Sequence, residues 1–219
     1  MEATTITTHP EKSYPASMRI FAKIISYIFH PALMPTLMML VFYRLLPASF
    51  ANNTRTFLSF FLPIVVCTAF LPIVGTLLTR GVGFIESIHM HNSKDRIIPL
   101  IISMTCYFWI NHVMDNLHAP LIVHTLTLGA FWGIIAIFMI NIFFKISMHT
   151  VAAGGVLGLF VVLMIISSVN LILPFFIVLV FAGLVGTARM ILRAHTNAEI
   201  WLGYIIGIMV QVGAYWYLS

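Results

Sequence analysis

LIVHTLTLGAFWGIIAIFMINIFF, residues 121–144, contains no Lys, Arg, Asp or Glu, and it decides the fold class. A helix needs about 20 predominantly apolar residues to cross a bilayer. This stretch is long enough, and three other apolar runs approach or reach the same length: Ile97–Val113, Val151–Ser168 and Ile200–Leu218. We therefore predict an integral membrane protein with several transmembrane helices.

The composition of the whole chain excludes a soluble globular domain. Hydrophobic residues make up 61% of the 219 positions and charged residues 8%, whereas soluble domains carry roughly 25% charged residues. The net charge is +5, but the basic residues are scattered at the ends of apolar runs, where they face lipid headgroups. We therefore expect membrane lipids and no nucleic acid as partners. Cys67 and Cys106 lie inside apolar runs and are expected to be small core residues.

Seven crossings can be placed along the chain. Residues 1–15 form a polar N-terminal segment without an apolar signal core, so we expect the mature protein to begin near Met1. Residues 16–30 are amphipathic and form either an interfacial helix or the beginning of the first crossing. The fold class is therefore all-α, a polytopic transmembrane bundle of about six to seven spans in a single domain, residues 16–219. The crossings are residues 33–46, 57–79, 97–113, 121–144, 151–168, 170–188 and 200–218.

The order of these crossings predicts a polar face. The connections at residues 80–96, 145–150 and 189–199 follow the second, fourth and sixth crossings, so all three emerge on the same side of the membrane. They also hold nearly all the ionisable residues of the second half of the chain. Ionisable groups are costly beside a bilayer, and their gathering at one face indicates a functional site.

The last of these connections reads ARMILRAHTNAE, residues 188–199. In one continuous helix Arg189 and His195 would lie about 240° apart. Thr196-Asn197-Ala198-Glu199 is a capping-box pattern, which starts a new helix and breaks the old one. His195 would then lie just outside a helix N-terminus, a location that suits a group that attacks or binds a phosphate.

The other two connections carry further candidates. Ser147 can cap the helix that follows it, and His149 lies in the first turn, where it could donate a proton to a leaving oxygen. The connection at 80–96 supplies Lys94 and Arg96, with His89 and His91 upstream. Cations, two histidines and a carboxylate are the groups that phosphoryl transfer through a histidine nucleophile requires.

The three connections resemble the motifs of the type 2 phosphatidic acid phosphatase superfamily, membrane relatives of the vanadium haloperoxidases. The motifs read KxxxxxxRP, PSGH and SRxxxxxHxxxD. The third matches best: Ala188-Arg189, five residues, His195, three residues and Glu199. Ile146–His149 keeps the Ser and His of the second motif but not its Pro and Gly. In the first motif Arg96 is followed by Ile-Ile-Pro99, and His89 occupies the lysine position.

The resemblance implies a haloperoxidase-like core and a role for each matched residue. His195 would be the nucleophile that forms a phosphohistidine, Glu199 would orient it, and His149 would be the general acid. Arg96, Arg189 and Ser147 would bind the phosphate, and Lys94 or His89 would supply the remaining group of the first motif. The implied enzyme is a phosphoric monoester or diphosphate hydrolase that acts on lipid phosphates, without a metal or other cofactor.

Other interpretations of the chain remain open. One is a non-catalytic member of the same fold that binds anionic lipid, which the incomplete first and second motifs favour. Another is a small membrane transporter, although no crossing carries an ionisable residue near its midpoint. A haem or di-metal oxidoreductase is a third. We expect a multi-pass protein of a bacterial cytoplasmic membrane, with the side that the site faces left open.

Several remaining residues are expected to have structural roles only. Four histidines, which are named at the end of this paragraph, lie near span ends or in apolar runs. Arg193 is expected to be an interfacial anchor. His89 and His91 lack a third ligand nearby, which disfavours a metal site. Gly154, Gly155 and Gly158 are expected to permit close helix packing. The histidines are His30, His112, His118 and His124.

Overall fold

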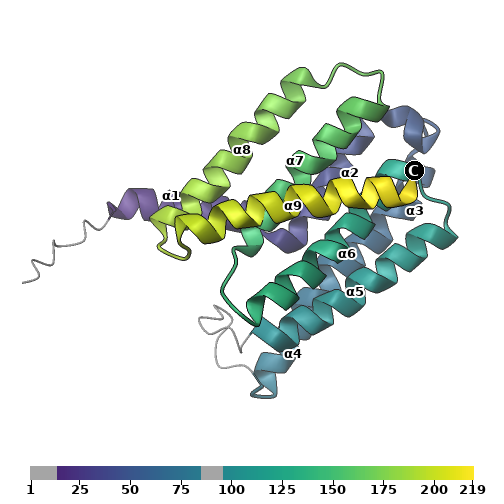
Figure 1. The fold of residues 1–219 in the computed structure, drawn as a ribbon. Helices are drawn as coiled ribbons and strands as arrows, with labels where there is room; N and C mark the ends of the chain where they lie inside the picture. Colours follow the sequence, from purple (N-terminus) through teal and green to yellow (C-terminus); the bar gives the residue numbers. More distant parts are fainter. Residues whose placement is uncertain (1–13, 85–95) are drawn as a thin grey trace, which may run out of the picture.

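The computed structural model describes residues 14–84 and 96–219, and within these ranges every regular element is helical (Figure 1). Seven helical segments of this part of the chain are long and apolar enough to cross a membrane. The chain is therefore an integral, multi-pass membrane protein. The candidate spans are Ala16–Leu45, Thr54–Gly81, Ile97–Asn116, Leu121–Asn141, Met148–Ile166, Ile172–Ile191 and Asn197–Leu218.

Prolines divide the first two spans into shorter helices. Pro31 and Pro35 lack the backbone N–H that a continuous helix needs, and here α1 gives way to a 3-10 turn and then α2. In the second span Pro63 precedes a π-helical turn. The pieces are α1 (Ala16–Ile28), η1 (Pro31–Leu33), α2 (Met34–Leu45), η2 (Pro47–Phe50), α3 (Thr54–Val65), η3 (Val66–Phe70) and α4 (Leu71–Gly81).

The later spans are single helices whose ends differ by a few residues from the apolar runs. Helix α6 ends at Asn141, three residues before the end of the apolar run at Phe144. The two differ because hydropathy does not mark where backbone hydrogen bonding stops. Helix α7 begins at Met148 because the Ser147 side chain caps it, accepting the Thr150 N–H at 3.4 Å. These helices are α5 (Ile97–Asn116), α6 (Leu121–Asn141), α7 (Met148–Ile166), α8 (Ile172–Ile191) and α9 (Asn197–Leu218).

Helices α7 and α9 pack backbone to backbone through glycines. A Cβ added at Gly154 would lie 2.8 Å from the Cα of Tyr204, and one at Gly158 would lie 2.9 Å from the carbonyl oxygen of Ile208. A Cβ at Gly207 would meet the carbonyl of Val151. Small residues allow such close approach inside membranes. The expected role of Gly154 and Gly158 is confirmed, and the contact ties the starts of α7 and α9 together.

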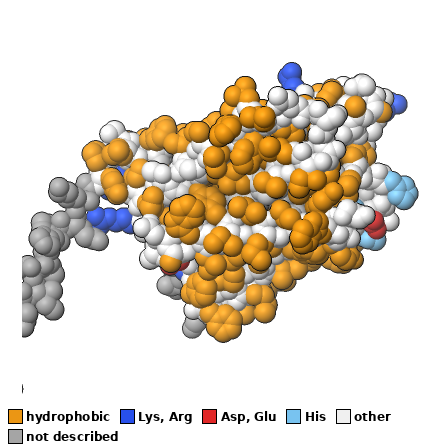
Figure 2. Space-filling view, turned by 45° about the horizontal axis from the view of Figure 1, so that its top comes forward, with side chains coloured by type: hydrophobic (Ala, Val, Ile, Leu, Met, Phe, Trp, Pro, Cys, Tyr) orange, Lys and Arg blue, Asp and Glu red, His pale blue; other side chains and the backbone are white. Residues whose placement is uncertain are grey.

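The outer surface and the connections fit a membrane-embedded bundle. Figure 2 shows hydrophobic side chains over the middle of the visible face and charged or histidine side chains toward its ends. In Figure 1 the α6–α7 and α8–α9 connections and the start of α5 lie at one end of the bundle. The α5–α6 and α7–α8 connections and the C-terminus lie at the other end. The prediction of a shared polar end is thus confirmed for the described residues.

Candidate functional site

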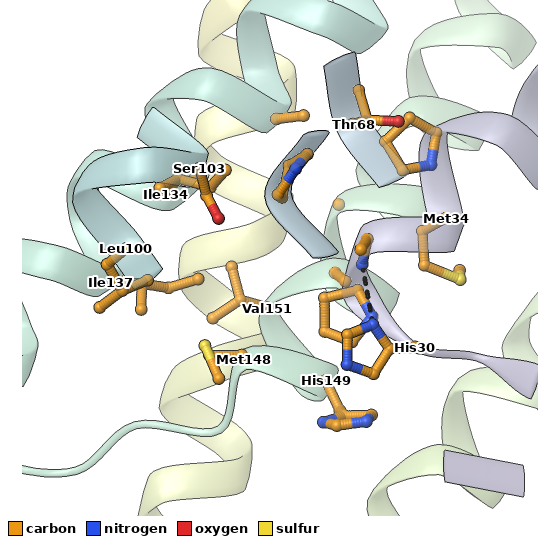
Figure 3. A pocket seen from close by; sticks show the side chains of 18 of the residues that line it. His30, Met34, Thr68, Leu100, Ser103, Ile134, Ile137, Met148, His149 and Val151 are labelled. Carbon is orange, nitrogen blue, oxygen red and sulfur yellow. Dashed lines mark hydrogen bonds between the residues drawn. The ribbon is translucent and has the colours of Figure 1, made fainter. Parts of the chain in front are cut away.

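A cavity of about 770 Å³ is lined in part by residues of these connections. The part lined by residues from the three connections is called the polar end here. Aliphatic side chains predominate in the rest, with Thr68, Ser103, Tyr107 and Gln211 among them; Figure 3 shows Leu100, Ile134, Ile137 and Val151 of this part. A volume in this range is typical of small-molecule sites. The polar residues from the connections and adjoining helix ends are Arg96, Lys145, His149, Arg189, Arg193 and His195, and the aliphatic ones include Leu100, Ile134, Ile137, Val151 and Val156.

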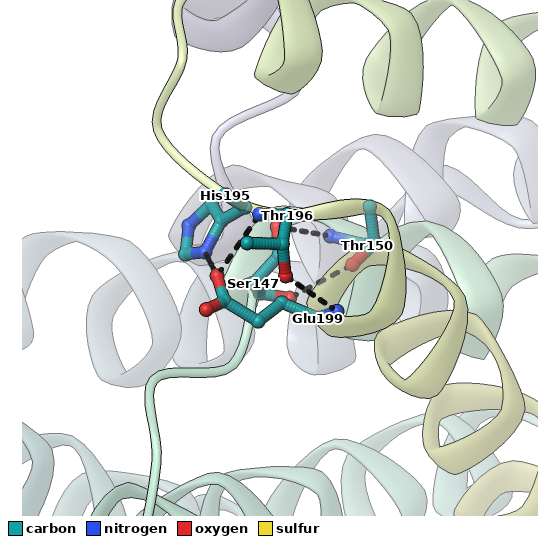
Figure 4. Close-up of polar contacts among 5 residues, drawn as sticks. All are labelled: Ser147, Thr150, His195, Thr196 and Glu199. Atoms are coloured by element: carbon teal, nitrogen blue, oxygen red, sulfur yellow. Dashed lines mark hydrogen bonds and ion pairs between the residues drawn. The ribbon is translucent and has the colours of Figure 1, made fainter. Parts of the chain in front are cut away.

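The α8–α9 connection places His195 against Glu199 (Figure 4). Helix α8 ends at Ile191 and α9 begins at Asn197, which confirms the predicted break. Thr196 and Glu199 form the predicted capping box: the Thr196 hydroxyl accepts the Glu199 N–H, and Glu199 Oε2 accepts the Thr196 N–H, both at 3.3 Å. The same Oε2 lies 2.8 Å from His195 Nδ1. Because a carboxylate oxygen only accepts, Nδ1 carries the proton and Nε2 keeps its lone pair.

Burial controls the charge of the connection residues. The His195 side chain is 3% exposed, and burial lowers its pKa to about 4, although the hydrogen bond from Nδ1 and the charge of Glu199 act in the opposite direction. His195 is therefore neutral near pH 7 and can act as a nucleophile. Burial also lowers the pKa of Lys145, reinforced by the positive charge of Arg96 and opposed by Glu199.

The two arginines predicted to bind phosphate lie near each other in the cavity wall. Arg96 is 6% exposed; burial lowers the pKa of its guanidinium and Glu199 opposes that shift, but an arginine side chain stays charged in proteins. Arg189 is half-buried, and its Nε is buried without a hydrogen-bond partner among the described residues. A buried donor without a partner costs free energy, and an anion in the cavity would supply one.

The C-terminal end of α1 contacts both His149 and Arg189. The Ser26 carbonyl lies 3.1 Å from His149 Nε2, and because a carbonyl only accepts, this nitrogen carries a proton. Arg189 Nη1 donates to the Ser26 hydroxyl at 3.5 Å. The ring of His30 packs edge-on against His149, with centroids 5.6 Å apart. These contacts hold the His149 ring in one orientation.

Ser147 is placed differently from the other predicted site residues. Its side chain is fully buried, it is not among the residues that line the cavity, and its hydroxyl accepts the Thr150 N–H as the helix cap. The capping role was anticipated, but the contact with phosphate has no support here, and we leave Ser147 out of the site described below. His89, His91 and Lys94 lie outside the described residues.

The structure adds residues that sequence reasoning left out of the site. His30, expected to be structural, and Arg193, expected to be a lipid anchor, both line the cavity, as do Lys145 and Ser26. Lys145 could have been predicted from the sequence, because it lies in the same connection as His149. For the α1 residues no local pattern could place them, because their position depends on α1 packing against α8. Ala22 and Ile25 pack there against Ala182, Val185 and Ala188.

The remaining expectations concern cysteines and metals. Cys67 and Cys106 are both free thiols, and Cys67 is buried, in agreement with their expected role as core residues. Within the described residues no three or more His, Cys, Asp or Glu side chains gather in an arrangement that could hold a metal ion.

The site so described combines arginine and lysine cations with two imidazoles, one of which is oriented by a carboxylate, so it can bind an anion and transfer a proton.

Comparison of the chain with protein-family models, with curated proteins and with solved structures finds no match.

Proposed function

We propose that this chain is a membrane-embedded lipid phosphatase that hydrolyses a lipid phosphate or diphosphate through a phosphohistidine on His195, without a metal ion. One observation carries the proposal. A neutral histidine held by Glu199 faces the same cavity as Arg96, Arg189 and a second histidine, His149. The resemblance to the type 2 phosphatidic acid phosphatases, and with it a haloperoxidase-like core, belongs to the same proposal.

The arginines and Lys145 bind the phosphoryl group. Arg189 brings an Nε–H that has no hydrogen-bond partner among the described residues, and guanidinium groups bind phosphate oxygens through charge-assisted hydrogen bonds. Arg96 and Lys145 add positive charge where negative charge spreads over the phosphoryl oxygens in the transition state. In a cavity walled by membrane helices, these interactions are stronger than in water.

His195 and His149 carry out the transfer. The Nε2 lone pair of His195 forms a bond to phosphorus while the bond from phosphorus to the lipid oxygen breaks. Glu199 stabilises the positive charge that develops on the imidazole through the Nδ1–H contact. The negative charge of the bound phosphate favours uptake of a second proton by the His149 ring, and His149 gives this proton to the leaving oxygen. The Ser26 carbonyl accepts from Nε2–H, so Nδ1 is the nitrogen that delivers this proton.

Hydrolysis of the intermediate reverses these roles. His149, now neutral, accepts a proton from water, and the water oxygen attacks phosphorus. The bond from phosphorus to His195 Nε2 breaks, and its electron pair returns to the ring. Inorganic phosphate leaves, and both histidines return to their first state.

The shape of the cavity supports a lipid substrate. Its polar end is lined by residues from the connections between spans, whereas aliphatic side chains of α5, α6 and α7, such as Leu100, Ile137 and Val151, line the part between the helices (Figure 3). A phosphate group can therefore bind at the polar end while an attached hydrocarbon chain lies between the helices. Lipid tails are as apolar as these side chains, so the chain can pass from the bilayer into the cavity at little cost.

The test is phosphate release by purified protein in nanodiscs, measured in EDTA over a panel of lipid phosphates and diphosphates. Wild type should release phosphate from at least one of them, and His195→Ala should release none. His112→Ala is the matched control, because His112 is exposed and is not among the residues that line the cavity. Full activity of His195→Ala would end the proposal. Binding without release across the panel would favour the non-catalytic anionic-lipid-binding protein instead.

A further inference from the structure

One wall of the cavity is built by α1, which lies outside all three connections. Lys23, Ser26 and Tyr27 line the cavity, and His30 follows just after the end of the helix. Positions three and four residues apart share one face of a helix. The opposite side of α1 carries Ile25, which packs in one apolar cluster with Ala182, Val185 and Ala188 of α8. The polar stripe of this amphipathic helix therefore faces the cavity.

His30 offers this wall a hydrogen-bond donor. The N–H of Ala32 donates to His30 Nδ1 at 3.3 Å, so in a neutral ring the proton lies on Nε2. Figure 3 shows His30 beside His149 at the cavity wall, and Arg189 is near enough to act on both rings electrostatically. Pro31, Ala32 and Met34, which follow His30 in the sequence, also line the cavity. His30 thus lies where the polar end of the cavity meets its apolar part.

The cations that line the cavity come from α1 as well as from the three connections. Among the described residues, five basic side chains line the cavity and no Asp or Glu side chain does, although Glu199 lies against His195. A phosphate monoester carries up to about two negative charges. In the proposed mechanism Arg96, Lys145 and Arg189 hold the transferred group, and Lys23 and His30 on α1 have no part in it. The five side chains are Lys23, Arg96, Lys145, Arg189 and Arg193.

We propose that the cavity face of α1 is a subsite for a second phosphate group, and that the preferred ligand is a lipid diphosphate. His30 Nε2–H and the Lys23 ammonium bind the phosphate attached to the lipid, while the terminal phosphate faces His195. His195 Nε2 bonds to the terminal phosphorus, the bond to the bridging oxygen breaks, and His149 protonates that oxygen. The α1 subsite then holds the leaving lipid monophosphate. This inference rests on the proposed function for the place of the terminal phosphate.

The test measures binding, so that it does not depend on turnover. Wild type and variants in nanodiscs of neutral lipid are titrated with two non-hydrolysable ligands of the same chain length, a methylene bisphosphonate and a monophosphonate. Wild type should bind the bisphosphonate more tightly. His30→Phe and Lys23→Gln should each weaken bisphosphonate binding by roughly ten-fold, the loss of one hydrogen bond to a charged group. Monophosphonate binding should change less than two-fold, within the roughly two-fold scatter of such effects.

Two control variants separate this subsite from general effects. Arg19→Gln removes a cation from the same helix at an exposed position that is not among the cavity-lining residues, so it tests attraction by the membrane surface. His112→Phe makes the same exchange as His30→Phe elsewhere. Lys23 is exposed, so Lys23→Gln should leave folding intact even if His30→Phe lowers the yield of folded protein.

Each outcome decides the inference. Equal affinity of wild type for the two ligands, equal losses for both ligands in the variants, or no binding of either ligand would overturn the α1 subsite. Selective loss of bisphosphonate binding supports it. If wild type shows that selectivity but releases phosphate from no lipid in the panel, the proposed function fails and the diphosphate subsite stands.

Discussion

The Nδ1 atom of His195 lies 2.8 Å from Oε2 of Glu199, and the same oxygen accepts the backbone N–H of Thr196. One carboxylate therefore serves two purposes: it caps helix α9 and orients the imidazole that we propose as the nucleophile. The two purposes can be separated by mutation, because a glutamine can still complete a capping box but carries no charge.

Glu199→Gln should keep the helix cap and lose catalysis. We expect kcat to fall by about 10²-fold or more, as when a neutral amide replaces the carboxylate behind a catalytic histidine. The thermal unfolding temperature should change little. Measurement of phosphate release and unfolding on the same preparation checks both.

Thr196→Ala is the reciprocal variant. It removes the hydroxyl that caps α9 and should lower the free energy of unfolding by about 1 kcal/mol, while the contact between His195 and Glu199 stays. We expect kcat within a few-fold of wild type. A large loss of activity in Thr196→Ala, with little in Glu199→Gln, would show that the helix cap matters and the charge does not.

The ionisation of His195 gives a prediction in pH. Its pKa is lowered to about 4, so the neutral ring prevails above that pH and its population falls as the pH drops through 4. Diethylpyrocarbonate modifies neutral imidazole, and its rate at His195, followed by mass spectrometry of the peptide, should fall with a midpoint near 4. A midpoint near the ordinary value of 6.5 would mean that the ring is not buried as described.

The glycine contact between α7 and α9 predicts a difference between two similar mutations. Gly154→Ala places a Cβ against the Tyr204 backbone and should destabilise the fold by about 1–3 kcal/mol, the usual cost of overpacking. It should also lower activity, because His149 and His195 lie near the ends that this contact ties together. Thermal unfolding and phosphate release check these effects.

Gly183→Ala is the matched control for that variant. Gly183 lies in α8, and a Cβ there has no heavy atom within 4 Å. Since alanine favours helix over glycine by up to about 1 kcal/mol, this variant should be as stable as wild type or more so. Equal destabilisation by both exchanges would contradict the close packing of α7 on α9.

Much of the bundle could be predicted because membrane helices follow simple rules of length and hydropathy. The break before His195 was also predictable, since Thr196 and Glu199 form a local capping signal. The shared polar end followed from the order of the crossings alone. These features depend on short stretches of sequence, or on the fact that successive crossings end on alternate sides of the membrane. Predicting them does not require knowledge of how the helices pack.

The site residues on α1 could not be predicted in this way. His30 lies next to His149 only because α1 packs on α8, a contact between residues far apart in the chain. Nothing near His30 distinguishes it from His112 or His124, which also lie close to span ends. Ser147 is a residue that the sequence placed in the site and the structure does not. A Ser followed by His two positions later fits both a helix cap and a phosphate ligand. Only the packing shows that its hydroxyl is buried.

The most direct test of the central claim is the identity of the atom that receives the phosphoryl group. Wild type is mixed with a lipid phosphate or diphosphate labelled with ³²P in its terminal phosphate, quenched in alkali, in which phosphohistidine survives, and digested for mass spectrometry. We predict label on His195, present in Thr196→Ala and absent in His195→Ala. Release of phosphate by wild type with no label on His195, or with label on another residue, would contradict the account.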